Sequence, residues 1–308
     1  MKKTSPRAAA VPRPALTRKS SRPKPTGDVS GLSLPDAKVV ERIRRDLLGW
    51  YRVHRRILPW RSDRPDAYHV MVSEAMLQQT QVATVIAYFQ RFVEALPTVQ
   101  ALAEAPEQQV LTLWQGLGYY RRARNLHAAA KAIVAEHGGK VPSTVEELLK
   151  LPGVGRYTAG AIASIAYGQP APIVDGNVAR VLARVFAIRQ SPDEPAVKAY
   201  LWDAAEALVP EDAAGDFNQS MMELGAMICL PRGPQCLICP LQEDCQARAL
   251  GLTQELPVKV VRKKPAAVEH HILAIQDQGK WYFQQRPATG LWSNMWQMPT
   301  AEELSVSA

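Results

Sequence analysis

The feature that most constrains this chain is a run of four cysteines within seventeen residues, CLPRGPQCLICPLQEDC. Cys229, Cys236, Cys239 and Cys245 are spaced C-x6-C-x2-C-x5-C, and the chain has no other cysteine. Four thiolates so close in sequence can enclose one metal centre, which would determine the fold of the loop between them. The spacing leaves zinc and an iron–sulphur cluster open, because both accept four thiolates. Disulfides are disfavoured, because the N-terminus has no apolar secretory segment and intracellular thiols stay reduced.

Apolar residues recur at helical spacing from about Pro35 to Leu250, and turn residues separate the segments. We predict helices over residues 36–54, 69–95, 106–116, 121–137, 144–150, 157–167, 175–189, 195–208 and 215–228, without a convincing strand. Residues 251–268 predict a linker. Two β-rich runs, about 270–275 and 281–286, then flank QDQGK and predict a hairpin. The expected fold class is mainly α with a small β-containing fragment.

The formal charge of +8 is concentrated in residues 1–30, which carry +7 and five prolines. The rest of the chain is therefore nearly neutral, and a nucleic-acid site there must be a local patch. We expect residues 1–30 to be a disordered basic tail that either adds non-specific phosphate affinity or is a plain solvated extension. A mitochondrial transit peptide fits this composition, but the prolines disfavour its amphipathic helix. No apolar stretch of about 18 residues predicts a membrane span.

Residues 151–160, LPGVGRYTAG, are typical of a hairpin between two helices. Gly153 and Gly155 permit a turn and a close backbone approach, and the N–H groups of the following helix form a phosphate seat. A plain structural turn is nevertheless the commoner cause of a GxG pattern. Twenty residues after Gly155, Asp175 opens another helix, with Asn177 beside it. Asp175 can be a simple N-cap, and an acid fixed there and kept ionised can also stabilise a cationic sugar.

A second carboxylate, Glu74, lies among apolar residues in VMVSEAMLQQTQVAT. Such a glutamate either reaches solvent, which is the commoner case, or is buried for a reason. Burial would raise its pKa and let it act as a general acid near neutral pH. One acid and one anion together match the division of labour in sugar hydrolysis.

These motifs in combination resemble a known family. The cysteine spacing after a helical body resembles the [4Fe–4S] loop of endonuclease III-like DNA glycosylases, and the hairpin followed by an aspartate resembles the HhH-GPD superfamily. SEAMLQQTQVATV closely resembles the signature of adenine-specific mismatch glycosylases of the MutY type. The resemblance runs from about residue 38 to 300 and includes LPWR, LWQGLGYYRRARNLH, VDGNVARVLAR and FNQSMMELGAMIC.

The resemblance implies an HhH-GPD fold over residues 31–250, with a six-helix barrel and an iron–sulphur helical domain. In this family the residue matching Glu74 protonates N7 of a flipped adenine, and Asp175 would stabilise the oxocarbenium ion. Asn177 would position water or Asp175. Bifunctional members carry a lysine at the position of Tyr157, whose amine attacks C1′. A tyrosine cannot form that Schiff base, so we expect Tyr157 to hydrogen-bond in the active site and the enzyme to hydrolyse without strand cleavage.

For DNA recognition, the resemblance implies that Gln78 and Tyr119 enter the base stack, with Leu77 alongside. Gln79 would help to read the lesion pair, and Arg61 would face the adenine pocket. Because extruding a base costs a few kcal/mol, something must fill the gap that it leaves.

Further residues keep two interpretations. Gly153 and Gly155 would contact the DNA backbone or serve only the turn. Arg232 is either a phosphate contact or an ordinary exposed arginine. The three arginines after GLGYY contact phosphates or form a solvated helix face, namely Arg121, Arg122 and Arg124. Tyr120 is expected to be a partly buried aromatic residue, and Trp60 and His127 to be core or surface residues.

Family members carry a Nudix-like C-terminal domain that helps to recognise 8-oxoguanine, and GLWSNMWQMPTAEEL matches its start. About 40 residues follow the linker, too few for a complete domain of that type. We therefore expect residues 269–308 to be a truncated domain. Either the sequence is a fragment or a frameshifted product, or the protein works with reduced lesion preference. Our hypothesis is weaker discrimination between 8-oxoguanine:A and G:A pairs than in full-length members.

The sequence thus predicts a base-excision enzyme that hydrolyses adenine from duplex DNA containing 8-oxoguanine:A or G:A, with a [4Fe–4S] cofactor. We expect a monomer that is cytoplasmic, bacterial and nucleoid-associated. One alternative is an endonuclease III-like lyase for oxidised pyrimidines, which Tyr157 and Glu74 argue against. Another is a non-catalytic iron–sulphur DNA-binding protein, which requires Glu74 and Asp175 to be incidental.

Overall fold

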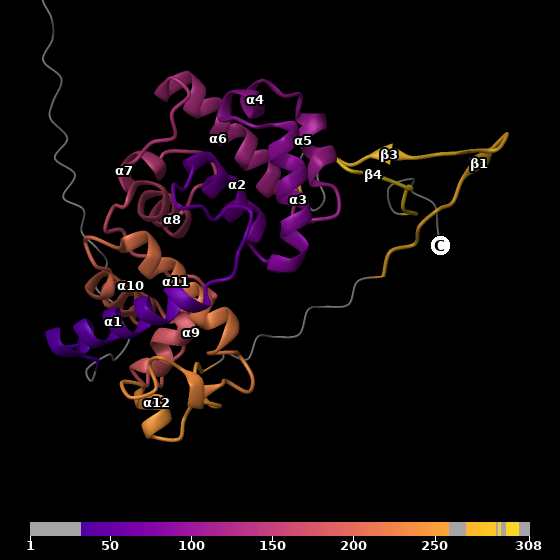
Figure 1. Cartoon of the computed structure of the whole chain (residues 1–308). Coiled ribbons are helices and arrows are strands. Elements are labelled where there is room, and N and C mark those ends of the chain that lie inside the picture. Colours follow the sequence, from indigo (N-terminus) through magenta and orange to yellow (C-terminus); the bar gives the residue numbers. More distant parts are fainter. Residues whose placement is uncertain (1–31, 259–268, 288, 291–293, 302–308) are drawn as a thin grey trace, which may run out of the picture. The chain divides into compact units, whose positions relative to one another are not determined.

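The computed structural model of the chain describes residues 32–258, 269–287, 289–290 and 294–301. The chain divides into two compact units, residues 1–260 and 261–308. In the described part of the first unit every regular element is a helix (Figure 1). The α-helices are α1 (Ala37–His54), α2 (Ala67–Leu77), α3 (Val82–Ala95), α4 (Val99–Glu104), α5 (Glu107–Trp114), α6 (Arg121–His137), α7 (Val145–Leu148), α8 (Arg156–Tyr167), α9 (Gly176–Val185), α10 (Pro195–Leu208), α11 (Ala214–Met227) and α12 (Gln246–Ala249). A 3-10 helix, η1 (Cys236–Ile238), lies within the cysteine loop.

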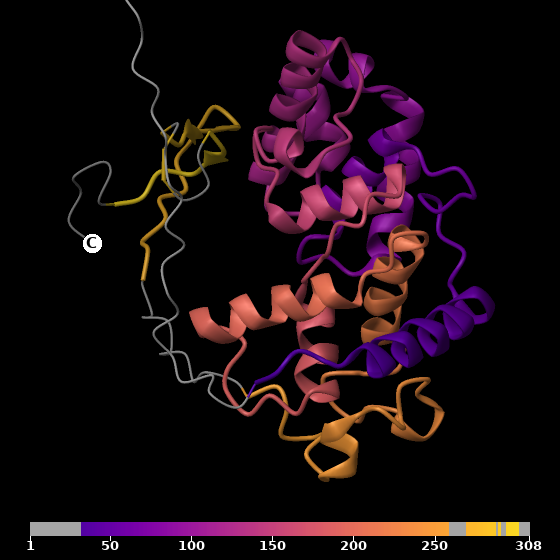
Figure 2. The same cartoon turned by 90° about the vertical axis from the view of Figure 1, so that its left-hand side faces the viewer.

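Two hydrophobic clusters organise this unit. Helices α2 to α8 enclose one, in which Met76, Phe92 and Trp114 are fully buried. Helices α1 and α9 to α11 enclose the other. Figures 1 and 2 show the same division as two lobes of helices. Helix α8 joins them, because Ile162 packs into the first cluster and Ala161 into the second.

Local sequence explains where the helices that carry the site begin. Asp66 caps α2 by accepting a hydrogen bond from the backbone N–H of His69 at 2.9 Å. Most of α2 is buried, as expected for a central helix that is apolar on nearly every side. Gly168 ends α8 in the left-handed conformation, with φ +68°, that glycine adopts without strain.

The predicted helical body is confirmed, but three of the predicted helices are wrong in their extent. The segment 69–95 is two helices, because the chain turns between residues 78 and 81 and Gln79 takes a φ of +59°. The segment 106–116 begins one residue later and ends at Trp114, and the separate helix α4 precedes it. Pro106 separates α4 from α5, since proline cannot donate the hydrogen bond that would continue a helix. Helix α9 also ends at Val185, short of the predicted residue 189.

The second unit contains short antiparallel strands. Strands β1 (Gln276–Asp277) and β2 (Lys280–Trp281) form a hairpin around Gln278 and Gly279, both with positive φ, and β3 (Gln284–Gln285) pairs with β4 (Trp296–Gln297). A hairpin at QDQGK is therefore confirmed, but the strands are shorter than predicted and are displaced from 270–275 and 281–286. The turn contains only two residues, so the strand pairing begins at the residues that immediately flank it.

The predicted basic tail, residues 1–30, lies outside the described residues, as does most of the predicted linker, residues 259–268. No helix in the described residues has the length and apolar character that crossing a bilayer requires.

Candidate active site

Glu74 lies in the last two turns of α2 with only 5% of its surface exposed. Its Oε2 accepts a hydrogen bond of 2.6 Å from the hydroxyl of Tyr157. Burial raises the pKa of Glu74 to about 7, with a smaller contribution from the nearby Asp175 and against the opposing effects of Tyr157 and Arg61. The buried alternative for Glu74 is therefore correct, and near neutral pH this side chain can hold a proton and release it.

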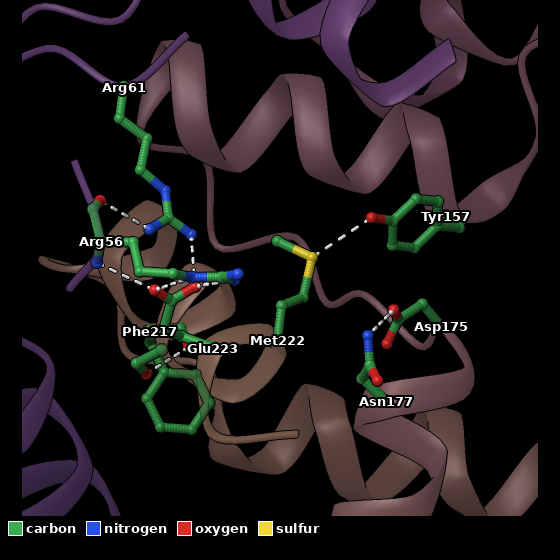
Figure 3. A network of polar contacts seen from close by, with 9 residues as sticks. Arg56, Arg61, Tyr157, Asp175, Asn177, Phe217, Met222 and Glu223 are labelled. Carbon is green, nitrogen blue, oxygen red and sulfur yellow. Dashed lines mark hydrogen bonds and ion pairs between the residues drawn. The ribbon is translucent and has the colours of Figure 1, made fainter. Parts of the chain in front are cut away.

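Tyr157 lies in the first turn of α8, directly after the glycine hairpin. Its hydroxyl also lies 3.2 Å from the sulfur of Met222 on α11, as Figure 3 shows. Burial raises the pKa of Tyr157 well above its ordinary value, and the carboxylates of Glu74 and Asp175 add to this. The side chain therefore remains a neutral phenol that donates a hydrogen bond.

Asp175 is the N-cap of α9, and its Oδ1 accepts a 2.7 Å hydrogen bond from the backbone N–H of Val178. Its Oδ2 accepts one from Nδ2 of Asn177 at 3.1 Å, as expected (Figure 3). Burial raises the pKa of Asp175, and its hydrogen-bond donors and Arg180 only partly oppose this effect.

A chain of hydrogen bonds leads from Asp175 to the cysteine loop. Nη2 of Arg180 donates to Oδ1 of Asn177 at 2.8 Å, and Nε donates to the backbone carbonyl of Cys229 at 2.8 Å. Helices α9 and α11 approach closely here, because a Cβ on Gly225 would lie 2.7 Å from Cβ of Asn177. The side chain that orients Asp175 is therefore itself held by the segment that carries the first cysteine.

The sequence analysis missed Glu223 on α11, a carboxylate with 1% of its surface exposed. Arg56 donates to it through its backbone N–H, its Nε and its Nη2 at 2.8–2.9 Å, and Arg61 donates from Nη2 at 3.0 Å (Figure 3). Burial alone would raise the pKa of Glu223, but these donors outweigh it and lower the pKa to about 2. In the sequence FNQSMMELGAM, Glu223 stands among apolar residues much as Glu74 does. This pattern is the sequence signal that could have indicated a buried carboxylate.

Arg61, which the resemblance placed at an adenine pocket, lies beside Glu74 closely enough to lower the pKa of that residue. Its guanidinium is engaged by Glu223, so it neutralises one acid while leaving the other with a raised pKa. The arrangement brings a protonatable acid, a fixed anion and a phenol to the boundary between the two lobes.

The four cysteines line one pocket next to Arg184, which donates to Sγ of Cys229 at 3.3 Å. All four are free thiols, so the disulfide alternative is not supported. Within the described residues no three His, Cys, Asp or Glu side chains converge tightly enough to hold one metal ion. Four free thiols around one pocket are the donor set that a four-thiolate metal centre requires.

The residues expected to meet DNA lie in two exposed loops. Gln78 caps the C-terminus of α2 and Gln79 follows it. Tyr119, 63% exposed, precedes α6 with a φ of +49°. Leu77 is half-buried against the first cluster.

The glycine hairpin lies close to the Gln78 loop, because Gln78 and Gly153 line the same hollow. Gly153 has a φ of +73°, which favours glycine, and a Cβ at this position would lie 2.4 Å from Cβ of Asn125. A glycine is therefore required here. Gly155 has ordinary φ and open space beside it, so the turn itself does not require that glycine.

Other basic residues differ in their surroundings. Arg121 and Arg232 are exposed, and Arg124 pairs with Glu107 at 3.0 Å. Arg122 does not lie on a solvated helix face, because its guanidinium binds backbone carbonyls. Trp60 and His127 are buried in the core, as one alternative held, and Tyr120 is partly buried.

Known proteins resemble this chain over most of its length. Residues 72–207 match the family described as the HhH-GPD superfamily base excision DNA repair protein. An adenine DNA glycosylase of Rattus norvegicus is 53% identical over 221 residues, covering 69% of this chain and 43% of the relative. Another, of Buchnera aphidicola subsp. Schizaphis graminum, is 37% identical over 254 residues, covering 82% of this chain and 73% of the relative.

The chain spans less than half the length of the mammalian relatives that it matches. Among solved structures, a thermostable thymine-DNA glycosylase has a TM-score of 0.61 and 29% identity. It covers 69% of this chain and 98% of its own. The expected HhH-GPD fold is therefore confirmed.

Proposed function

This chain belongs to the adenine DNA glycosylase family, as its motifs predicted, and on that premise we propose that it removes adenine mispaired with 8-oxoguanine or guanine in duplex DNA. The reaction is hydrolysis of the N-glycosidic bond, which leaves free adenine and an abasic site. The observation that carries this proposal is the pairing of Glu74, with a pKa near 7, and the capped anion Asp175 at one lobe boundary.

Glu74 donates its proton to N7 of the extruded adenine, which makes the base a better leaving group. As the C1′–N9 bond breaks, positive charge develops on the sugar, and ionised Asp175 stabilises it, directly or through a transient bond to C1′. Water then adds to C1′, breaking any bond between C1′ and Asp175, and its proton returns through solvent to Glu74. Asn177 holds Asp175, and we assign it the second task of positioning that water.

Tyr157 supports hydrolysis rather than lyase chemistry. It occupies the hairpin position where an amine would form a Schiff base, and it instead donates a hydrogen bond to Glu74. This contact orients the acid, and it speaks against the endonuclease III-like alternative.

Duplex DNA lies, in this proposal, across the exposed hairpin and the two loops that carry Gln78, Gln79 and Tyr119. The hairpin presents the first N–H groups of α8, which have no side-chain cap, so they can bind a phosphate. Gln78, Tyr119 and Leu77 fill the stack when adenine leaves it.

We further propose that the four cysteines hold a [4Fe–4S] cluster. When bound, it supplies four iron–thiolate bonds that tie the loop of residues 229–245 together. Arg184 donates to one ligand and to the carbonyl of Leu230, so it orders the loop from the side of α9.

The test is incubation of the full chain with an 8-oxoguanine:A duplex labelled on the adenine strand. We expect adenine release, strand cleavage only after alkali, and no adduct trapped by borohydride. Cleavage without alkali, or trapping, would establish lyase chemistry instead. A Glu74→Gln variant that binds the duplex but releases no adenine is the matched control, and equal activity on oxidised pyrimidines would favour the lyase alternative.

A further inference from the structure

Arg122, at the start of α6, is a half-buried cation whose hydrogen-bond acceptors are all neutral. Nη1 donates to the carbonyls of Ala75 at 3.1 Å and Met76 at 2.8 Å, and also to that of Gln78. Burial lowers the pKa of Arg122, which no carboxylate compensates. Burying a charge without an opposite charge beside it costs free energy. We therefore ask what the hydrogen bonds of Arg122 contribute to the site.

The same guanidinium joins two loops that are far apart in sequence. Nη2 donates to Oγ1 of Thr80 at 3.2 Å and to the carbonyls of Leu117 and Gly118 at 3.2 and 3.3 Å. The carbonyls that Nη1 binds belong to the C-terminus of α2. Unpaired carbonyls and the helix dipole favour a cation at such an end. Arg122 thus ties the end of the helix that carries Glu74 to the loop before α6.

Each of these loops contains a strained residue. Gln79 has a φ of +59° and Tyr119 a φ of +49°, in the left-handed region that is strained for residues other than glycine. Arg122 binds the carbonyl that precedes each of them, on Gln78 and on Gly118. Its guanidinium also lies 5.4 Å from the ring centre of Tyr119. One side chain therefore contacts the backbone beside both strained residues.

We propose that Arg122 is a positioning residue that locks the two base-probing loops together and to the helix of Glu74. It sets the Gln78 and Tyr119 side chains in the geometry that displaces adenine, and it couples that displacement to the acid that protonates the base. This inference rests on the proposed function, whose loops it explains.

The competing role is a direct phosphate contact. In the described structure both Nη atoms are occupied by protein acceptors, and the remaining Nε is buried without a partner. Arg121 is exposed beside it and provides the matched comparison. A phosphate contact adds about 1 to the salt dependence of DNA binding, whereas a positioning residue leaves that slope unchanged.

The experiment measures adenine extrusion apart from chemistry. In the Glu74→Gln background, 2-aminopurine beside the target adenine reports unstacking when an 8-oxoguanine:A duplex is bound. We expect Arg122→Gln to bind with an unchanged salt slope but to give about a third or less of the fluorescence rise. With Glu74 intact, we expect the single-turnover rate to fall about 100-fold, as for a small misplacement of reacting groups. Arg122→Lys keeps the charge without the fork, so partial recovery is expected.

Arg121→Gln is the control, and it should leave extrusion intact. If Arg122→Gln folds poorly, Thr80→Val removes one acceptor and should lower extrusion about 3- to 10-fold, whereas Thr80→Ser should not. Full extrusion by Arg122→Gln, or a salt slope reduced by about 1, overturns this inference while adenine release by the unaltered chain still supports the proposed function. Absence of adenine release by the unaltered chain overturns both.

Discussion

The hydroxyl of Tyr157 lies 2.6 Å from Oε2 of Glu74, although 83 positions separate the two residues in the chain. The contact joins the hairpin helix α8 to the central helix α2, which carries the acid. Burial raises the pKa of Glu74 to about 7 although this hydrogen bond opposes the rise. A residue that follows the glycine hairpin therefore affects the proton on Glu74.

The first prediction is a pH dependence. Glu74 must carry its proton to donate it, and its pKa is about 7, so the single-turnover rate should fall as pH rises through 7. At pH 8 we expect about a tenth of the rate at pH 6. Excision of adenine from an 8-oxoguanine:A duplex under enzyme excess measures it, and a rate that stays flat between those pH values would contradict it.

The second prediction concerns Tyr157→Phe. Removing the hydroxyl removes the hydrogen bond that lowers the pKa of Glu74, so that pKa should rise. The fall in rate should then move to higher pH, by up to about one pH unit, with a lower maximal rate because the acid is less well oriented. Met222→Leu keeps the Tyr157 hydroxyl and serves as the control, whose alkaline limb should match that of the unaltered chain.

A third prediction follows for stability. The folded pKa of Glu74 lies above its ordinary value of 4.5, so the native state holds this proton more tightly than the unfolded state. The contribution of protonated Glu74 to the free energy of unfolding is therefore fully present below pH 4.5 and is lost as pH rises toward 7. Glu74→Gln has no such loss, so its free energy of unfolding relative to the unaltered chain should increase across this window, by about 1.4 kcal/mol for each pH unit. Denaturant unfolding at several pH values tests this, and a constant difference would refute it.

The sequence could predict those site residues whose chemistry follows from the residue type itself. Glu74 and Tyr157 were identified from motifs, and both lie in the site. What the sequence could not supply is which neighbours surround each group. Asp175 has the predicted cap, yet its pKa is raised because packing between α9 and the rest of the lobe removes water from it.

The fold was predictable where a local signal marks each end of a helix, as at Asp36 before α1 and Gly138 after α6. The break after α2 carries no proline or glycine, and the carbonyl of Gln78 at this break accepts a hydrogen bond from the distant Arg122. Glu223 was missed for the same reason, since its partner Arg56 lies 167 positions away.

The fourth prediction concerns that buried pair. Glu223→Gln leaves Arg56 and Arg61 without their carboxylate in a partly buried setting, so we expect a loss of about 3 kcal/mol in the free energy of unfolding at neutral pH. Glu107→Gln is the control, because its pair with Arg124 is exposed and should contribute no more than about 1 kcal/mol. Equal effects of the two substitutions would show that burial does not matter here.

The last prediction concerns Arg180, which connects Asn177 to the carbonyl of Cys229. Burial raises the pKa of Asp175, and the charge of Arg180 opposes this, so Arg180→Gln should raise that pKa further. Because Asp175 acts as an anion, its loss of charge lowers the rate as pH falls, and the variant should lose activity at a higher pH on the acid side.

Arg180→Lys keeps the charge but not the fork of donors, so it should retain the acid limb of the unaltered chain while its maximal rate falls. Rates on the acid side of the optimum, measured together with the visible absorbance of an iron–sulphur cluster, separate the two effects. An unchanged acid limb with lost absorbance would mean that Arg180 acts only through the cysteine loop. A shifted limb with intact absorbance would place its effect on Asp175.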